Sequence, residues 1–210
     1  MTRKIFLAVP LLFAVPFLAQ EISHAEDRAV ISYVQGEGMI MRNSLAIPAA
    51  VGIPCQKNDA LKTGANCTLD LSMNNLVGCR VLASSRCLIA ETNPNAMQVK
   101  IENGNAILNL EKLPKDSAFK VETPTAIAAV RGTQFWGRVD LNQPANPVTT
   151  FAVRQGSVEI FTKAAGLNLL IKQGQALDIP KDPAVVPSLR PALAEELAAM
   201  EQASSVKTSA

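Results

Sequence analysis

The chain has 210 residues, with 20 basic and 18 acidic side chains and a formal net charge of +2 at pH 7. Such balanced charge gives no electrostatic steering toward a polyanion, so nucleic acid is excluded as an expected partner. The length suits one domain with a sizeable hydrophobic core. Any partner is therefore expected to be recognised by shape and apolar contact.

The first 25 residues have the pattern of a cleaved secretory signal peptide. Arg3 and Lys4 form a basic start, and Ser23-His24-Ala25 supplies small residues at the cleavage positions. The apolar run at 5–19 is interrupted by proline and is shorter than the roughly 20 residues that a spanning helix needs, so a retained anchor is the weaker alternative. We predict a signal peptide at 1–25 and a mature protein that is periplasmic or secreted, without a transmembrane segment.

The chain contains one histidine, His24, and it lies inside the predicted signal peptide. The mature protein would then have no imidazole for nucleophile activation or for the common zinc sites. We predict that it is not an enzyme and that it holds no cofactor and no metal. Chemistry by carboxylates alone is the remaining alternative, and it would need a clustered pair of carboxylates in a deep pocket.

The four cysteines lie within a short part of the chain, in a protein that is expected to leave the reducing compartment. Two structural disulfides fit this number and this setting. A four-cysteine zinc site would normally show paired Cys-x-x-Cys spacing, which these cysteines lack. The predicted disulfide residues are Cys55, Cys67, Cys79 and Cys87.

The connectivity of these cysteines has three possibilities. Expected turns at Asn74-Asn75 and near Ser84-Ser85 would place the segments around the last three cysteines side by side. On this basis we favour one connectivity, in which Cys79 pairs with Cys87 and Cys55 pairs with Cys67.

Short segments rich in β-branched and apolar residues recur along the chain, separated by the turn-forming residues Gly, Asn, Pro and Ser. This pattern predicts an all-β domain. At 69–73 apolar and polar residues alternate, as in a strand with one face on the core. Glycines within 103–105, 155–157 and 173–175 predict successive hairpin or coil corners. We predict a two-sheet sandwich with solenoid-like coiling over residues 26–182.

The composition changes after Pro183 and Pro187. Ser188 is a potential N-cap, and apolar residues then recur at helical spacing through an Ala/Glu-rich stretch. We predict that residues 183–210 form a proline-rich linker, one amphipathic C-terminal helix and a frayed tail. The helix would fold back over an open sheet edge or present its apolar stripe to a partner's groove, and we favour the first. The apolar positions are Leu189, Leu193, Leu197 and Met200.

Several ordered motifs carry a resemblance to a known family. An Asp-x-Leu-x-Thr-Gly corner stands at 59–64, a Thr-Pro and an Arg-Gly-Thr lie within 121–135, and strand-turn-strand patterns follow at 153–160 and 171–176. In this order they resemble the FecR domain, an extracytoplasmic β-rich module named for the periplasmic regulator of iron(III) dicitrate transport. The resemblance covers roughly residues 36–180.

This resemblance implies a module that binds another protein, in envelope sensing or signalling, without catalysing a reaction. The expected partner is an envelope protein, either a receptor or a sigma-factor regulator, and the oligomeric state is left open. The regulators that name the family carry a membrane span before the domain, which is not expected in this chain. The alternative is a structural or glycan-binding envelope module, which the small number of aromatic residues disfavours.

The central motif is expected to be a corner, because a proline favours an extended residue before it and a glycine permits a sharp turn. Arg131 has five donors and is expected to brace loop carbonyls from inside the bend, with a partner-binding arginine as the alternative. Neighbouring Phe135 and Trp136 would point to opposite faces of a strand, with Phe135 in the core. Trp136 would be an interface anchor or be covered by the C-terminal segment. The candidate structural or partner-binding residues are Thr123, Pro124, Arg131, Gly132, Thr133, Phe135 and Trp136.

Overall fold

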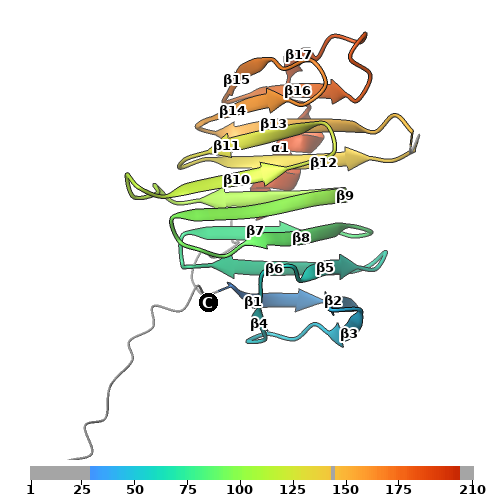
Figure 1. Cartoon of the computed structure of the whole chain (residues 1–210), viewed down its shortest axis with the longest axis vertical. Coiled ribbons are helices and arrows are strands. Elements are labelled where there is room, and N and C mark those ends of the chain that lie inside the picture. The colour runs from blue at the N-terminus through green and yellow to red at the C-terminus, as the bar shows by residue number, and fades with distance from the viewer. Residues whose placement is uncertain (1–28, 143–144, 204–210) are drawn as a thin grey trace, which may run out of the picture.

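The computed structural model describes residues 29–142 and 145–203, and the predicted signal peptide lies outside them. Figure 1 shows a stack of strands that runs from β1–β4 at one end to β15–β17 at the other. One helix, α1 (Ala194–Gln202), lies against the side of the stack. The predicted mostly β architecture with one C-terminal helix is confirmed.

The strands pair in two ladders, and the chain crosses between them repeatedly, usually after one or two strands. The helix-side ladder contains, in spatial order, β4 (Pro54–Cys55), β1 (Ala29–Gln35), β6 (Thr68–Met73), β7 (Val77–Val81), part of β9 (Ala96–Leu110), β12 (Gln134–Asp140), β13 (Val148–Gln155), β16 (Gln175–Pro180) and β17 (Ser188–Pro191). The far ladder contains β3 (Leu45–Pro48), β2 (Gly38–Arg42), β5 (Ala60–Thr63), β8 (Arg86–Glu91), the other part of β9, β10 (Ala118–Glu122), β11 (Ala126–Val130), β14 (Ser157–Thr162) and β15 (Asn168–Lys172).

Strand β9 belongs to both ladders, so the strands form one connected mixed sheet that is neither closed nor strongly curled. This differs from the prediction of two separate sheets. The reason lies at Gly104, which was expected to end a strand but instead bends β9 with a φ of +79°. A Cβ at this position would lie 2.3 Å from the Ser85 hydroxyl oxygen, so the backbones of neighbouring coils approach closely here.

Other expected corners are confirmed. Asn74 and Asn75 both have positive φ and connect β6 to β7. Gly156 and Gly174 also have positive φ, at the crossings from β13 to β14 and from β15 to β16. Each crossing therefore uses a residue type that adopts the left-handed conformation at low cost.

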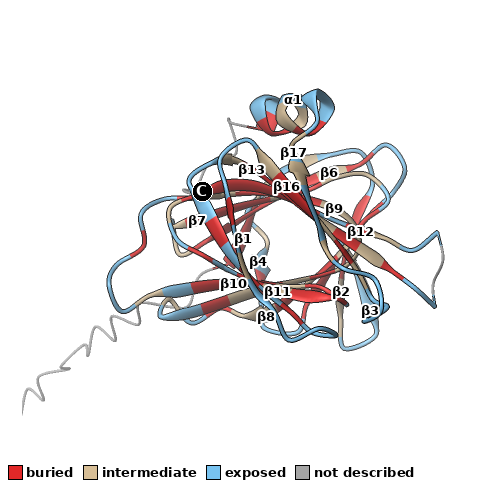
Figure 2. Ribbon diagram, turned by 90° about the horizontal axis from the view of Figure 1, so that it is seen from above, coloured by how far each residue is buried: buried red, intermediate tan, exposed pale blue. Residues whose placement is uncertain are grey.

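The inner faces of both ladders supply one hydrophobic cluster, and Figure 2 shows in red the stretches of the strands whose residues are buried. The rings of Phe135 and Phe151 lie 6.2 Å apart in this cluster, and both side chains are fully buried. Burying a side chain of this size contributes about 1.5–3 kcal/mol. The cluster spans the length of the stack, from Ile31 on β1 to Ile179 on β16.

The C-terminal segment folds back as we favoured, but α1 packs on the face of β12 and β13 and not over an open sheet edge, and it begins later than predicted. Residues 188–191 form strand β17, and α1 begins only at Ala194, so Ser188 is not its N-cap. The Glu196 side chain accepts a hydrogen bond from the Leu193 backbone N–H at 2.8 Å, which satisfies a donor at the start of the helix. No helix in the described part of the chain has the length and apolar character needed to cross a bilayer.

Candidate functional site

The Thr-Pro segment forms a buried corner between β10 and β11. The Thr123 hydroxyl accepts a hydrogen bond from the Ala126 N–H at 3.1 Å, and the Thr149 hydroxyl from β13 lies 3.0 Å from it. The Lys163 ammonium donates to the Thr123 carbonyl at 2.7 Å. Thr123 is fully buried, so this part of the motif braces the fold from within. Pro124 sits in the turn itself, as expected for a residue without an N–H to pair.

The Arg-Gly-Thr segment forms the crossing from β11 to β12. Arg131 is exposed and donates one long hydrogen bond, 3.4 Å, to the Leu113 carbonyl, rather than the several that we expected of an internal brace. Gly132 has a φ of +65°. The Thr133 hydroxyl donates to the Ser157 carbonyl at 3.0 Å, which ties this corner to the next coil.

Phe135 and Trp136 point to opposite faces of β12, as their spacing predicts. Phe135 lies in the main core, whereas Trp136 lies in a second cluster between the helix-side ladder and α1. Met200 is the fully buried helix residue in this cluster. Trp136 is 9% exposed, so of the two alternatives for this residue, cover by the C-terminal segment is the one that the structure shows. Its indole N–H is buried without a partner among the described residues.

Polar contacts fix α1 over Trp136. The Arg190 guanidinium lies 2.7 Å from Asp178 and 2.7 Å from Glu196, so it joins β16, β17 and the helix. These two carboxylates raise the pKa of Arg190, mainly through the hydrogen bond to Glu196. At the other end of the helix, the buried Gln134 amide donates to the Met200 carbonyl at 3.0 Å.

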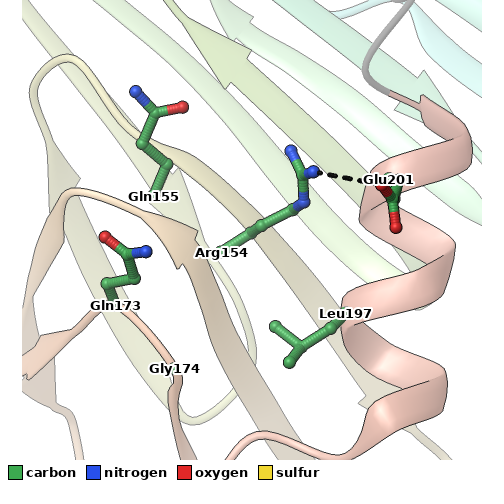
Figure 3. Close-up of a pocket in the computed structure, with 6 residues that line it drawn as sticks. All are labelled: Arg154, Gln155, Gln173, Gly174, Leu197 and Glu201. Carbon is green, nitrogen blue, oxygen red and sulfur yellow. Dashed lines mark ion pairs between the residues drawn. The ribbon is translucent and has the colours of Figure 1, made fainter.

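Beside this covered surface lies an open cleft of about 570 Å³, between α1 and the turns that follow β13 and β15. Figure 3 shows Arg154 extending from β13 toward Glu201 on the helix. The Arg154 guanidinium donates to the Gln134 side-chain oxygen at 2.8 Å, and it lies 3.7 Å from the Glu201 carboxylate. The lining residues are Arg154, Gln155, Gln173, Gly174, Leu197 and Glu201.

The chemistry of this cleft is that of recognition. Glu201 is 74% exposed, so its ion pair with Arg154 is screened by water and is worth at most about 1 kcal/mol. A guanidinium held on one side by Gln134 therefore keeps donors that an incoming carboxylate or carbonyl can take. Among the described residues, no group of three or more His, Cys, Asp or Glu side chains is placed to hold a metal ion.

The structure shows none of the predicted disulfides. All four cysteines are free thiols, and all four are buried. Burial raises the pKa of Cys55 and of Cys79 to about 12 in each case. The pKa of Cys87 on β8 is also raised, by burial and then by the charge of Cys79 on β7.

The early Asp-x-Leu-x-Thr-Gly motif also has a structural role. Asp59 is 1% exposed and accepts two hydrogen bonds from Arg42, at 2.9 and 2.7 Å. The Thr63 hydroxyl donates to the Leu82 carbonyl at 2.6 Å and accepts from the Ser85 N–H at 2.9 Å. Like Thr133, it ties one corner to a neighbouring coil.

Sequence reasoning did not find the cleft. In the sequence, Arg154 belongs to the strand-turn-strand pattern at 153–160, and Gln173 belongs to a predicted corner. Their proximity depends on the pairing of β13 with β16 and on the position of α1, and no local pattern encodes either. The one available signal was the pairing of acidic helix residues with isolated arginines on preceding strands.

Crossing strands tied by corner threonines form a mostly β domain, with a helix over one face. The family model described as FecR protein matches residues 59–159, and these residues are a FecR domain. The match lies inside the wider range that the sequence motifs suggested.

Two solved structures of a candidate anti-sigma factor from Parabacteroides distasonis are similar in fold, at 2.50 and 1.65 Å resolution. Each is 15% identical to this chain with a TM-score of 0.57, over 68% of this chain and 64% of that chain. The likeness thus spans less than two thirds of that protein and concerns the fold. Among curated proteins, none matches the chain.

Proposed function

We propose that this protein is a non-enzymatic protein-binding module that works in the periplasm or after secretion, in envelope sensing or signalling. Its partner is an envelope protein, either a receptor or a sigma-factor regulator. The FecR domain and the fold shared with a candidate anti-sigma factor support this class. In this proposal the two ladders act as the layers of a coiled sandwich, which presents the cleft on a rigid support.

The observation that carries the proposal is the open cleft around Arg154. It combines a partly paired guanidinium, two glutamine amides and an apolar leucine beside a helix. Such a mixture suits a protein segment that brings a carboxylate or carbonyl together with an apolar side chain. Partner binding there replaces the weak contact with Glu201 and leaves the Gln134 hydrogen bond in place.

The alternative function is a structural or glycan-binding envelope module. Carbohydrate sites usually place aromatic rings against the sugar faces, and none of the described residues that line this cleft is aromatic. The cleft therefore favours a protein partner.

Site-specific photo-crosslinking in cells tests the proposal. A photoreactive residue at Gln173 should capture a receptor or a sigma-factor regulator, whereas one at exposed Lys62 on the far ladder should not. Arg154→Gln should lower the captured yield by about tenfold or more, the usual effect of losing a charge-assisted hydrogen bond. Arg138→Gln is the matched control, because Arg138 is exposed on β12 and pairs with Asp140. Capture of envelope polymer alone would favour the alternative, and a yield independent of Arg154 would contradict the cleft as the site.

A further inference from the structure

Four strands form the open edges of the described sheet. Each of them pairs with one neighbour only, whereas the other described strands have neighbours on both sides. Open edges expose unpaired backbone groups that other chains can join, so proteins usually protect them. The edge strands are β3 and β4 at the N-terminal end of the stack and β15 and β17 at the C-terminal end.

Three of these edges carry a proline at a position that faces outward. On β3, the Ala49 N–H donates to the Gly38 carbonyl at 2.9 Å. Bonded and non-bonded pairs alternate in an antiparallel ladder, so the preceding residue, Pro48, faces the open side. Proline has no N–H there and cannot complete a ladder with another chain. By the same alternation of bonded and non-bonded pairs, the backbone groups of Pro54 on β4 and of Pro191 on β17 also face the open side.

Strand β15 has no such protection. The Thr162 N–H donates to the Leu167 carbonyl at 2.9 Å, and the Gln173 N–H donates to the Gly156 carbonyl at 3.0 Å. The backbone groups of the residues between these pairs therefore alternate, and those that face the open side belong to Asn168, Leu170 and Lys172. The Lys172 N–H is held by the Gln175 side chain at 2.8 Å, whereas Asn168 and Leu170 keep theirs for a partner strand.

The outer surface next to this edge is apolar. Leu170 is 50% exposed and Phe161 is 41% exposed. A shallow groove of about 340 Å³ runs from Ile127 past Phe161 to Leu170 and ends at the β15 edge. An unprotected strand beside an apolar groove is the combination that strand addition uses.

We propose that the β15 edge binds the β15 edge of a second copy of this chain, antiparallel and centred on Leu170. In this register Leu170 lies opposite Leu170 of the second copy, and their N–H and C=O groups pair. Asn168 lies opposite Lys172 of the second copy, so no two like charges face each other. On the inner face, half-buried Leu169 lies opposite Ile171 of the second copy, which extends both cores. A strand that is complementary to itself in this way gives a closed twofold dimer.

The full-length protein, expressed with its own N-terminus, tests the dimer by sedimentation velocity from low to high micromolar concentration. The wild-type protein should reach twice the monomer mass. Leu170→Lys should remain monomeric, because it opposes two ammonium groups at the centre of the interface. Leu45→Lys is the matched control, since Leu45 is exposed on the proline-protected edge β3, and this variant should dimerise as the wild type does.

Amide hydrogen exchange identifies the interface and guards against a variant that misfolds. The Leu170 and Asn168 amides should become protected as the wild-type protein is concentrated, whereas the Leu169 amide, already bonded to β14, should not change. A monomer at all concentrations, or a dimer in which the Leu170 amide stays unprotected, would overturn the proposal. Protection that appears only when an extended strand from another protein is added would also overturn it and would assign the edge to that partner.

Discussion

The two ends of the strand stack are built differently. At the N-terminal end, both edge strands carry outward-facing prolines, and the Arg42 guanidinium joins β2 to buried Asp59 and to the Pro54 carbonyl at 2.8 Å. At the C-terminal end, β15 carries no outward proline. A short helix covers the side of the stack there, and its ion-pair network around Arg190 includes Asp178, which is 30% exposed. One end is closed by outward-facing prolines and a buried carboxylate, and the other leaves surfaces that a second molecule can use.

This contrast separates stability from recognition along one continuous sheet. A buried ion pair has strong consequences when it is broken, whereas exposed pairs have weak ones. The N-terminal end is therefore expected to respond to substitution by global loss of stability. The C-terminal end is expected to respond by local release or by altered association.

Among the substitutions, the largest loss of stability is expected from Asp59→Ala. It leaves the Arg42 charge without its carboxylate and removes an acceptor from the Gln56 N–H at 2.7 Å, so the free energy of unfolding should fall by about 3 kcal/mol. Asp178→Ala is the matched variant at the other end, where the carboxylate is 30% exposed, and it should cost about 1 kcal/mol or less. Urea unfolding of both variants gives the comparison. Equal losses would mean that the ends do not differ in this way.

The next effect is expected from Met200→Ala, which removes the fully buried contact between α1 and Trp136. The helix should be released at a cost of about 2 kcal/mol, the low end for such a truncation, because the exposed side can relax. The fluorescence of Trp136, the only tryptophan, should shift to the red, and protease should cut near the helix while the strands stay intact. Leu193→Ala, at a half-exposed position, should leave the emission unchanged. A loss of cooperative unfolding in the strands would show that the helix belongs to the core.

Features that repeat at short range could be predicted from the sequence. Alternating residues predicted strands, and the opposite faces of Phe135 and Trp136 followed from their adjacency. Gly104 predicted a corner at the right position, but it did not predict whether the strand ends there or bends. A residue with left-handed backbone conformation can do either, and in the structure β9 bends and continues. Only the pairing of β9 with strands of both ladders distinguishes the two.

The candidate site could not be predicted in the same way. The cleft forms only where β13, β16 and α1 meet. The direction in which each edge proline faces depends on which backbone groups of its strand are hydrogen-bonded to the neighbouring strand. A one-residue change of phase would turn Pro48 toward its neighbour, and the composition would be the same. The disulfides were predicted from number and compartment, whereas burial of each thiol is decided by tertiary packing.

A further effect is expected from alkaline pH, and it concerns the half of the stack that contains the cysteines. The pKa of Cys55 and of Cys79 is about 12 in the folded protein because burial disfavours the thiolate. The unfolded thiols ionise from their ordinary pKa near 9, so the stabilising effect of burial is complete below that pH and is lost as the pH rises toward 12. The slope should approach about 1.4 kcal/mol per pH unit for each thiol within this window.

Urea unfolding between pH 8 and pH 10.5 measures this slope, and Cys55→Ala should make it shallower. Thiol titration after denaturation provides the independent control, because free cysteines should all react. If no thiol reacts in the denatured protein and the slope is absent, disulfides have formed in place of free thiols.

The smallest change in stability and the most direct test of the contrast are expected from Pro48→Val. The substitution restores an outward N–H on β3 and adds a β-branched residue that suits a strand, so stability should change by no more than about 0.5 kcal/mol. The N-terminal edge should then associate with other copies, because its protection is gone. The Leu170→Lys background removes the proposed β15 contact, so a rise in mass measured by sedimentation can come only from the newly opened edge. If this double variant stays monomeric while the wild-type protein dimerises, the proline is not what protects the N-terminal edge. Some other feature would then prevent association at the exposed Leu45 on the same strand.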